Sequence, residues 1–509
     1  MSTRSILVQP PPYPFTLEAL RPNSMLASLA SILENAGHTT GVLDCATVEC
    51  FERLYPDAVR AELSTVSREN EGSRRWFGQR VPKPLRQQYR KVSAEIAEGV
   101  ASIYALDFVG ILIESFEDLK TVASFSTVLR KKRPELVFVA LGNYFVNNPS
   151  AASQVLKFVD AVYTGGPSPA FAYLADSIRD RPRWASVPDL TFREGQEIRV
   201  SQPSGTREVG TLPSPAYDPE IYPAMREATK IMVFDVDGSY PVRAVPPNAE
   251  LPPGTEPLYT ASELVLDEVV RLHRMFRTRA FHIRGVDESP ESADALSFGL
   301  MSRGISAQYS RDSNVASATF STLAAMKTSG CCAVSFDIQS GSQRLLDDHY
   351  GTYLSVSTAE DVIHTARRAG MFTVTRFTFP CIADDYHTKA ETLRLISRMK
   401  PSSVAILFAQ ASQNAVPTRR MRRDQEELFE AIRELGIPTD QTPELGLLAA
   451  LAGQAGQETA FRDRVEYQLT TGDCDGLAKL VERINRMARV QIPSVEFKPF
   501  VPIQKAMGN

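Results

Sequence analysis

The chain has 509 residues, and its 43% hydrophobic content is enough for several packed cores, which excludes a wholly disordered protein. The 56 Lys and Arg side chains nearly balance the 60 Asp and Glu side chains, and a net charge of -4 gives no sign of a nucleic-acid or membrane-surface binder. No apolar stretch reaches the roughly 20 residues of a membrane span, and no signal peptide is recognisable. We therefore expect a cytoplasmic protein of about three domains.

The first part of the chain alternates short apolar runs with helical patterns. The runs predict strands at 5–8, 40–44, 108–113, 136–141 and 161–163. An amphipathic helix is expected at 25–36, where Gly37 ends it. This alternation predicts a doubly wound parallel sheet over residues 1–184.

Ligands bind such sheets beyond the carboxyl ends of the strands. The loops expected there are rich in Pro, Gly and polar residues, and they supply the candidate cofactor-binding residues of this domain: Pro11, Tyr13, Glu114, Ser115, Gly142, Asn143, Gly165, Gly166 and Pro167.

A polar stretch, 51–102, lies between the second and third expected strands, and we predict a helical insertion there. It carries several Arg and Lys side chains around Trp76 and Phe77. Two interpretations are open: a solvated helical excursion, and a lid or patch for an acidic partner.

Residues 185–225 are rich in proline and polar residues and are predicted to form a linker. A second alternation follows and predicts a partial or full (β/α) barrel over 226–412. A mostly helical region is expected over 413–509, and its basic run RRMRRD is most simply a solvated face. The barrel strands are expected at 231–235, 280–283, 306–309, 333–337, 373–378 and 404–408.

The six cysteines show no CxxC spacing, which suits a reducing compartment. Cys331 and Cys332 follow Gly330 and are most simply a small buried pair at the start of a strand, rather than a metal or redox site.

These segments together resemble the cobalamin-binding radical SAM enzymes, over about residues 5–408. The first domain reads ILVQPPPYP, then ENAGH, then GVLD, and the linker contains VPDLTFREGQEI and LPSPAYD. The barrel contains GVDES, SFDIQSGSQRLLD and FTFPCIADD in the family's order. The resemblance implies an N-terminal Rossmann-like cobalamin (B12) domain, a radical-SAM-like partial barrel and a helical C-terminal region.

The resemblance also implies which positions hold the cofactors. Glycines such as Gly142, Gly165 and Gly166 would let backbone N–H groups approach the corrin amides and nucleotide phosphate. The DxHxxG motif of many B12 proteins is absent, and His38 is expected to be a cap or surface residue. We therefore expect cobalamin without a protein histidine on cobalt.

The family's CxxxCxxC loop, which holds three irons of a [4Fe–4S] cluster, is missing. Its three positions fall on Ser239, Arg243 and Pro246, and no Cys lies between Cys50 and Cys331. Because such a cluster requires thiolates, we do not expect one. Arg243 is either a surface residue or a positive charge where the cluster and the SAM carboxylate would meet.

Other barrel positions also differ from the family. Gln339 replaces a ribose-contacting Glu, although its amide can still accept from a hydroxyl, and residues 379–383 lack the glycines of a GxPGE motif. Either the SAM pocket is remodelled or SAM is not bound.

Two functions follow from these features. The first is a cobalamin-dependent, SAM-using enzyme that transfers a methyl group or carries out a radical-type rearrangement on a small molecule, for example in natural-product biosynthesis. Its candidate catalytic residues are Asp287, Glu288 and Arg376, with Asp287 and Glu288 as base or substrate anchor; buried salt-bridge partners are the rival interpretation. Further polar residues are expected at strand ends: Asp235, which is also a cofactor-binding candidate, Asp237, Arg284, Arg311 and Asp337.

The second function is a non-catalytic cobalamin-binding paralogue that acts as a partner, carrier or sensor, and it implies a protein partner. The lost cluster positions favour it, whereas the retained polar residues at strand ends favour the enzyme.

Overall fold

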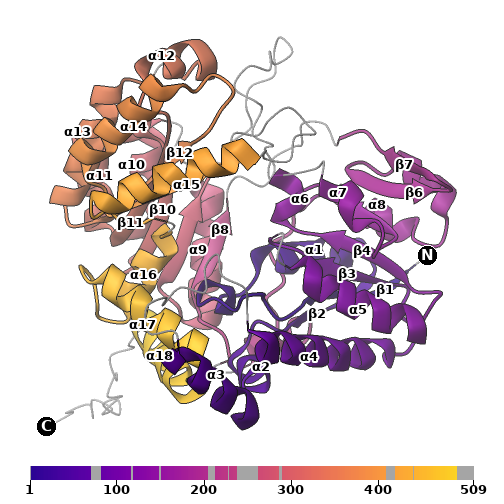
Figure 1. Ribbon diagram of the computed structural model, residues 1–509. Helices are drawn as coiled ribbons and strands as arrows, with labels where there is room; N and C mark the ends of the chain where they lie inside the picture. Colours follow the sequence, from indigo (N-terminus) through magenta and orange to yellow (C-terminus); the bar gives the residue numbers. More distant parts are fainter. Residues whose placement is uncertain are drawn as a thin grey trace, which may run out of the picture.

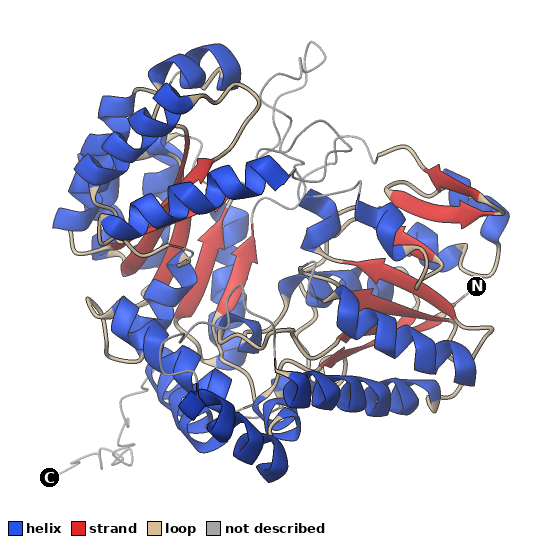
Figure 2. Cartoon of the chain, in the orientation of Figure 1, coloured by secondary structure: helices blue, strands red, loops and turns tan. Residues whose placement is uncertain are grey.

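The computed structural model describes residues 2–69, 82–115, 118–147, 151–203, 212–226, 229–237, 262–285, 289–352, 354–407, 419–439 and 441–489. Two β-sheets form the centre of the molecule, each covered by helices, and the C-terminal helices pack beside both of them (Figure 1, Figure 2). The expected order of a doubly wound domain, a partial barrel and a helical region is confirmed.

The first sheet has seven strands in the order β2-β1-β3-β4-β5-β6-β7, and the first five are parallel. Their bounds are β1 (Arg4–Gln9), β2 (Thr39–Asp44), β3 (Phe108–Leu112), β4 (Val137–Leu141), β5 (Ala161–Tyr163), β6 (Leu190–Glu194) and β7 (Glu197–Val200).

The hairpin β6–β7 lies in the stretch predicted to be a linker, so that prediction is wrong for this part. β6 pairs antiparallel with β5 and β7 with β6, around a turn in which Gly195 has φ +60°. Phe192 packs edge-on against the buried Trp184, with 5.8 Å between ring centroids. Apolar contacts of Leu190 and Phe192 with the sheet edge outweigh the turn-like composition of the segment.

Helices cover both faces of this sheet, as the doubly wound prediction requires. Helices α1 (Ser24–Asn35) and α8 (Pro169–Asp176) pack on one face, and α4 (Lys83–Ala101) and α5 (Leu119–Lys132) pack together on the other. Strand β3 is buried along its whole length, because both of its faces contact helices.

The polar stretch 51–102 is helical, but it is not a solvated excursion where it is described. It forms α2 (Val48–Leu54), α3 (Asp57–Glu69) and α4. In α4 the buried residues Leu85, Tyr89, Val92, Ile96 and Val100 recur at helical spacing and pack against the sheet layer. Residues 70–81, with Trp76 and Phe77, lie outside the described residues.

The second sheet has six parallel strands in the order β8 to β13. They are β8 (Phe234–Asp237), β9 (Ala280–Arg284), β10 (Gln308–Ser313), β11 (Cys331–Gln339), β12 (Phe372–Thr378) and β13 (Ser403–Leu407). Helices α9 (Ser262–Phe276), α10 (Pro290–Ser302), α11 (Phe320–Thr328), α13 (Val356–Arg368) and α14 (Tyr386–Met399) cover its outer face (Figure 1).

Two strands of this sheet begin later than predicted. Residues 231–233 precede β8, because the Met232 N–H donates to the side chain of Asn485 (2.7 Å) instead of joining the sheet. Strand β10 starts at Gln308, because the Ala307 N–H bonds locally to Ile305.

The C-terminal helices are α15 (Arg419–Glu434), α16 (Pro443–Leu451), α17 (Glu458–Thr471) and α18 (Cys474–Ala488). Helix α16 packs on the inner face of the second sheet, near the amino ends of β11 and β12. A Cβ atom at Gly446 would lie 2.6 Å from the Phe372 ring and 2.9 Å from the Ala333 Cβ, so glycine allows this close approach.

Short helices complete the described elements. They are α6 (Asn143–Asn147), α7 (Ala152–Val155), α12 (Gln343–Leu345), η1 (Glu18–Leu20), η3 (Arg181–Ser186), η4 (Pro223–Met225), η5 (Val315–Ser317) and the π-helical turn η6 (Leu346–Tyr350).

The structure also bears on the role expected for the cysteines and on the expected lack of a membrane-spanning helix. All six cysteines are free thiols, and Cys331 and Cys332 open β11 as a buried and a half-buried residue, which fits the small-residue interpretation. Among the described residues, no helix is both long enough and apolar enough to cross a bilayer.

Candidate functional site

The strand order of the first sheet reverses between β1 and β3, and the loops after these two strands are tied together by Asp118. Its carboxylate accepts the backbone N–H groups of Glu114 (3.0 Å) and Ser115 (2.9 Å), and also a backbone hydrogen bond from Tyr13. Burial raises the pKa of Asp118, although these donors oppose the rise. Asp118 was not predicted, and it brings the predicted residues Tyr13, Glu114 and Ser115 together at the carboxyl edge of the sheet, where ligands bind such folds.

Glu114 is the central polar group of this edge. Its carboxylate accepts from Asn23 Nδ2 (3.5 Å) and is hydrogen-bonded to the side chain of Asn143, which follows β4. Glu114 is exposed, yet the protein around its carboxyl desolvates it and raises its pKa to about 7. The positive charge of Arg284, at the end of β9 in the second sheet, partly opposes that rise.

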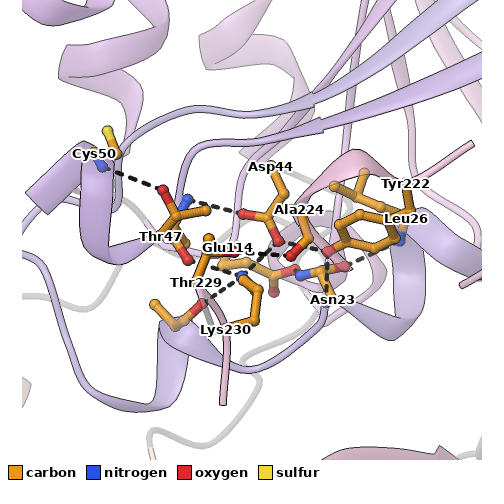
Figure 3. A network of polar contacts seen from close by, with 12 residues as sticks. Asn23, Leu26, Asp44, Thr47, Cys50, Glu114, Tyr222, Ala224, Thr229 and Lys230 are labelled. Atoms are coloured by element: carbon orange, nitrogen blue, oxygen red, sulfur yellow. Dashed lines mark hydrogen bonds and ion pairs between the residues drawn. The ribbon is translucent and has the colours of Figure 1, made fainter. Parts of the chain in front are cut away.

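A chain of buried hydrogen bonds holds Asn23 in place (Figure 3). The Asn23 backbone N–H donates to the Tyr222 hydroxyl (2.9 Å), which donates to Asp44 (2.5 Å). Lys230 Nζ lies 2.5 Å from Asp44, and both side chains are fully buried. Lys230 also donates to the carbonyl oxygens of two residues that flank this region, Ala19 (3.2 Å) and Ala46 (2.9 Å).

The predicted glycines have reasons within the fold. Gly142 has φ +131°, and a Cβ there would lie 2.2 Å from the Ile113 carbonyl oxygen. A Cβ at Gly165 would lie 2.7 Å from the Asp189 carboxylate and 2.8 Å from the Tyr163 hydroxyl. These glycines therefore let strand-end loops pack closely, whether or not a cofactor approaches them.

The rest of the predicted loop residues differ in exposure. The Tyr163 hydroxyl donates to the Gly166 carbonyl (3.0 Å) and closes the turn after β5. Pro167 is buried, and so is Pro11 in the loop after β1. Tyr13 is buried edge-on against Tyr89 of α4, with 4.8 Å between ring centroids. Pro11, Tyr13 and Pro167 therefore shape the loops, whereas Glu114, Ser115, Asn143 and Gly166 keep accessible surface.

On the inner face of the second sheet, Asp235 belongs to an ionic network that sequence reasoning did not find. Asp235 pairs with Arg21, from the loop after β1, and lies 3.7 Å from Arg284. Arg21 and His282 both approach Glu444 of α16, at 3.5 Å and 3.4 Å. Burial opposes ionisation of Glu444, but His282, Arg21 and Arg284 together hold its pKa well below its usual range.

This network joins the loop after β1 to β8, β9 and α16, and no local sequence signal points to Arg21 or Glu444. The Asn485 side chain of α18 adds to it by donating to the Lys230 carbonyl (2.8 Å) while accepting from Met232. The first domain, the second sheet and the C-terminal helices are thereby held as one unit around β8.

A second polar group lies further along the same inner face. Arg376 of β12 lies 3.2 Å from Asp312 of β10, across β11. Asp337 pairs in register with Arg376, and burial raises its pKa although Arg376 opposes the rise. The structure thus places Arg376 and Asp337 together, as candidates at strand ends, and adds Asp312.

Two other predicted strand-end residues have different surroundings. Arg311 is fully buried on the helical side of β10, where burial lowers its pKa to about 10, so it does not line the inner face. Gln339 ends β11 after an irregularity in register and has φ +66°. Beyond it, a Cβ at Gly341 would lie 2.3 Å from the Thr392 Cα of α14, so close packing explains that glycine.

Several predicted residues cannot be placed. Asp287, Glu288 and Arg243 lie outside the described residues, as do Ser239 and Pro246, and the same holds for the side chain of Asp237. Among the described residues, no three His, Cys, Asp or Glu side chains gather as metal ligands would. His38, expected to be a cap or surface residue, caps α1 through its backbone N–H, which donates to the Leu33 carbonyl (3.0 Å), while its side chain is buried and accepts from the Thr3 N–H.

Comparisons with known proteins find a relative by sequence and several solved structures with a similar fold. A scan against models of protein families finds no match. An uncharacterised methyltransferase from Pyrococcus horikoshii is 24% identical over 282 residues, which cover 53% of this chain and 60% of that protein.

Among solved structures, the cobalamin-dependent S-adenosylmethionine radical enzyme OxsB with aqua-cobalamin bound superposes with a TM-score of 0.52 and 12% identity, over 87% of this chain and 58% of OxsB. The radical S-adenosylmethionine methyltransferase TsrM from Kitasatospora setae, with tryptophan and a SAM analogue bound, gives a TM-score of 0.49 and 15% identity, over 80% of this chain and 73% of TsrM. The chain thus has the fold of OxsB, and it spans about three-fifths of the length of OxsB and of the Pyrococcus relative.

Proposed function

We propose that this chain is a cobalamin-dependent enzyme that uses SAM to modify a small molecule, by methyl transfer or radical-type rearrangement, without the usual [4Fe–4S] cluster. One observation carries the proposal: the loop after β1 meets the second sheet, where Arg21 pairs with Asp235 of β8, which lies 3.7 Å from Arg284 at the end of β9. In this fold a cofactor on the first sheet would face a substrate on the second. The names of OxsB and of the Pyrococcus relative support this class of chemistry.

The residues at the first edge fit a corrinoid. The corrin ring carries amide side chains, which both donate and accept hydrogen bonds. Glu114 and Asn143 present a carboxyl and an amide at the carboxyl edge of the first sheet, and Ser115 and Gly166 remain accessible. Bound cobalamin would supply a cobalt centre that carries a methyl group or releases a carbon radical.

The chain's own residues have distinct roles in this proposal. A carboxyl with a pKa of about 7 can donate or accept a hydrogen bond near neutral pH, so Glu114 suits both kinds of corrin amide atom. Asp118 fixes the backbone of Glu114, and Asn23 and Asn143 orient its carboxyl. Arg376, Asp312 and Asp337 would position the substrate, and Asp287, Glu288 and Arg243 remain candidates from the sequence.

The absence of a cluster is proposed from ligand chemistry. Three thiolates are needed to hold it, and of the six cysteines Cys381 alone follows the carboxyl end of a strand of the second sheet, shortly after β12. Cys331 and Cys332 lie at the opposite, amino end of β11. Reconstitution with iron and sulfide should give no broad iron–sulfur absorbance; about three irons per chain would overturn this part.

The test is cobalamin retention after incubation with hydroxocobalamin and gel filtration, followed by addition of SAM. We expect a bound corrinoid spectrum and formation of S-adenosylhomocysteine or another SAM product. Glu114→Ala should weaken retention by roughly tenfold. Glu135→Gln, an exposed carboxylate near the start of β4, is the matched control and should leave retention unchanged. A chain that retains no corrinoid would overturn the proposal.

A second candidate is a non-catalytic cobalamin-binding protein. The loss of the glycines at 379–383 and of the cluster cysteines favours it. It predicts a retained corrinoid with no consumption of SAM, so the same experiment separates the two functions.

A further inference from the structure

The inner face of the second sheet has two halves: one is covered by helix α16, and the other carries charged side chains that keep accessible surface. Near the amino ends of the strands, α16 packs on the sheet through Gly446, and Glu444 joins the ionic network. Towards the carboxyl ends lie Asp312, Asp337 and Arg376, where Asp337 is exposed and the other two are partly accessible.

Strand register shows that these side chains share one face. Asp312 pairs with Ser335, and Asp337, two residues further along β11, pairs with Arg376. Because neighbours in register and residues two apart point to the same side of a sheet, Ser335 lies between the two carboxylates. Arg376 reaches across β11 to Asp312, over Ser335.

The charges of this group do not balance. Among the described residues, two carboxylates face the one guanidinium of Arg376, and Arg284, on the neighbouring strand β9, is held by Asp235. Burial raises the pKa of Asp337, and Asp312 adds to the rise by repulsion. A cation brought close to both carboxylates would relieve this repulsion.

Hydrogen bonds are also incomplete at this place. Ser335 is fully buried, and its hydroxyl has no hydrogen-bond partner among the described residues. Arg376 Nε likewise has no hydrogen-bond partner in the described part of the chain, whereas Asp312 Oδ1 faces Arg376 Nη2 at 3.2 Å. Buried polar atoms are nearly always paired in folded proteins, so the unpaired Ser335 hydroxyl indicates a bound polar molecule.

We infer that this face binds a protonated amine of the small-molecule substrate, held by Asp312, Asp337 and the Ser335 hydroxyl. The inference rests on the proposed function and adds the substrate's chemical class. An ammonium group has three donors and no acceptor, and the three residues offer acceptors. An anionic substrate would instead meet two carboxylates, and a neutral apolar one would leave the Ser335 hydroxyl unpaired.

The test is ligand-observed ¹⁹F NMR with a fluorinated fragment set that contains equal numbers of primary amines, neutral amides and carboxylic acids. We expect binding to be dominated by the amines. Asp337→Asn and Asp312→Asn keep the side-chain shape but remove charge, and each should weaken amine binding by roughly tenfold. Asp361→Asn, an exposed carboxylate on the outer helix α13, is the control and should not change it.

Three results would overturn the inference: no bound amines, a preference for acids or neutral fragments, or amine binding that both variants leave unchanged. SAM also carries an ammonium group, so SAM is added as a competitor. Displacement of the amines by SAM, with weaker SAM binding in Asp337→Asn, would assign the site to SAM instead. Cobalamin retention is measured on the same samples, so failure of the proposed function is recognised separately.

Discussion

The carboxyl edge of the first sheet and the inner face of the second both carry charged side chains, but they satisfy them differently. Under the first edge, Lys230 and Asp44 form a fully buried one-to-one pair, and each makes further hydrogen bonds to Tyr222 or to backbone atoms. On the second sheet, two carboxylates share Arg376, and the Ser335 hydroxyl has no described partner.

This difference separates structural charges from charges that a ligand can use. A buried pair with complete hydrogen bonds has a fixed geometry and gains little from a ligand. An unbalanced and partly accessible group keeps acceptors that a ligand can complete. Glu114 lies between these two kinds of charge: Asn23 and Asn143 orient its carboxyl, as in a structural pair, yet it remains exposed and can contact a ligand.

The largest expected effect comes from breaking the structural pair. Lys230→Met leaves the Asp44 carboxylate buried without its cation, so we expect a loss of about 3–5 kcal/mol in unfolding free energy. Urea unfolding followed by tryptophan fluorescence measures it, because Trp184 is buried in the first domain.

The double variant Lys230→Met, Asp44→Leu removes both charges and serves as the control. It should be clearly more stable than the single variant, since no uncompensated charge remains. Equal stability of the two variants would mean that Asp44 is not a buried charge. The paired charges under the first sheet would then no longer differ from the unbalanced charges on the second sheet.

The next effect tests whether Gly142 serves the fold. Gly142→Ala combines a positive φ with a Cβ 2.2 Å from the Ile113 carbonyl, and it should cost about 3 kcal/mol. Gly37→Ala is matched, because Gly37 has φ +85° but no atom within 4 Å of its added Cβ, and it should cost about 1 kcal/mol. Similar unfolding midpoints for the two variants would show that the close approach to Ile113 is unimportant.

The sequence predicts much of the fold because its signals are local. The apolar run 137–141 and the β-branched stretch 373–378 form largely buried strands, and the amphipathic stretch after Asn23 is a capped helix. The hairpin β6–β7 was missed because its stability comes from Trp184 and the edge of β5, which lie outside the segment.

The site was less predictable because its contacts are long-range. Glu114 and Asn143 could be proposed from their places after strands, whereas Asn23 has only the signal of a helix N-cap. Arg21 and Glu444 are more than 400 residues apart in the sequence, and only the packing of α16 inside the second sheet brings them together. No pattern of composition or spacing carries that information.

A smaller effect tests the intermediate position of Glu114 through pH. Its pKa is about 7 in the folded protein and about 4.5 in an unfolded chain, so the folded state binds more protons between these values. Stability should therefore fall as pH rises from about 4.5 to about 7 and then level off. Because Glu114 is exposed, solvent screening limits the change to roughly 1 kcal/mol.

Glu114→Gln mimics the protonated carboxyl and should abolish this change, so the difference between the two unfolding midpoints should grow from pH 5 to pH 8. A difference that is constant with pH would mean that Glu114 is an ordinary surface carboxylate. The edge of the first sheet would then lack a group that titrates near neutrality.

The smallest effect concerns exposed charges that lie neither at the carboxyl edge of the first sheet nor on the inner face of the second. Arg420 on α15 is 91% exposed and lies 3.8 Å from Asp424, one turn away. Exposed pairs of this kind contribute little, so Arg420→Ala should change the unfolding free energy by less than about 0.5 kcal/mol. It should also leave amine binding and cobalamin retention unchanged, because the basic run is expected to be a solvated face. A clear loss of either ligand would instead place α15 among the parts of the molecule that contact them, and the division into structural and ligand-binding charges would have to include this helix.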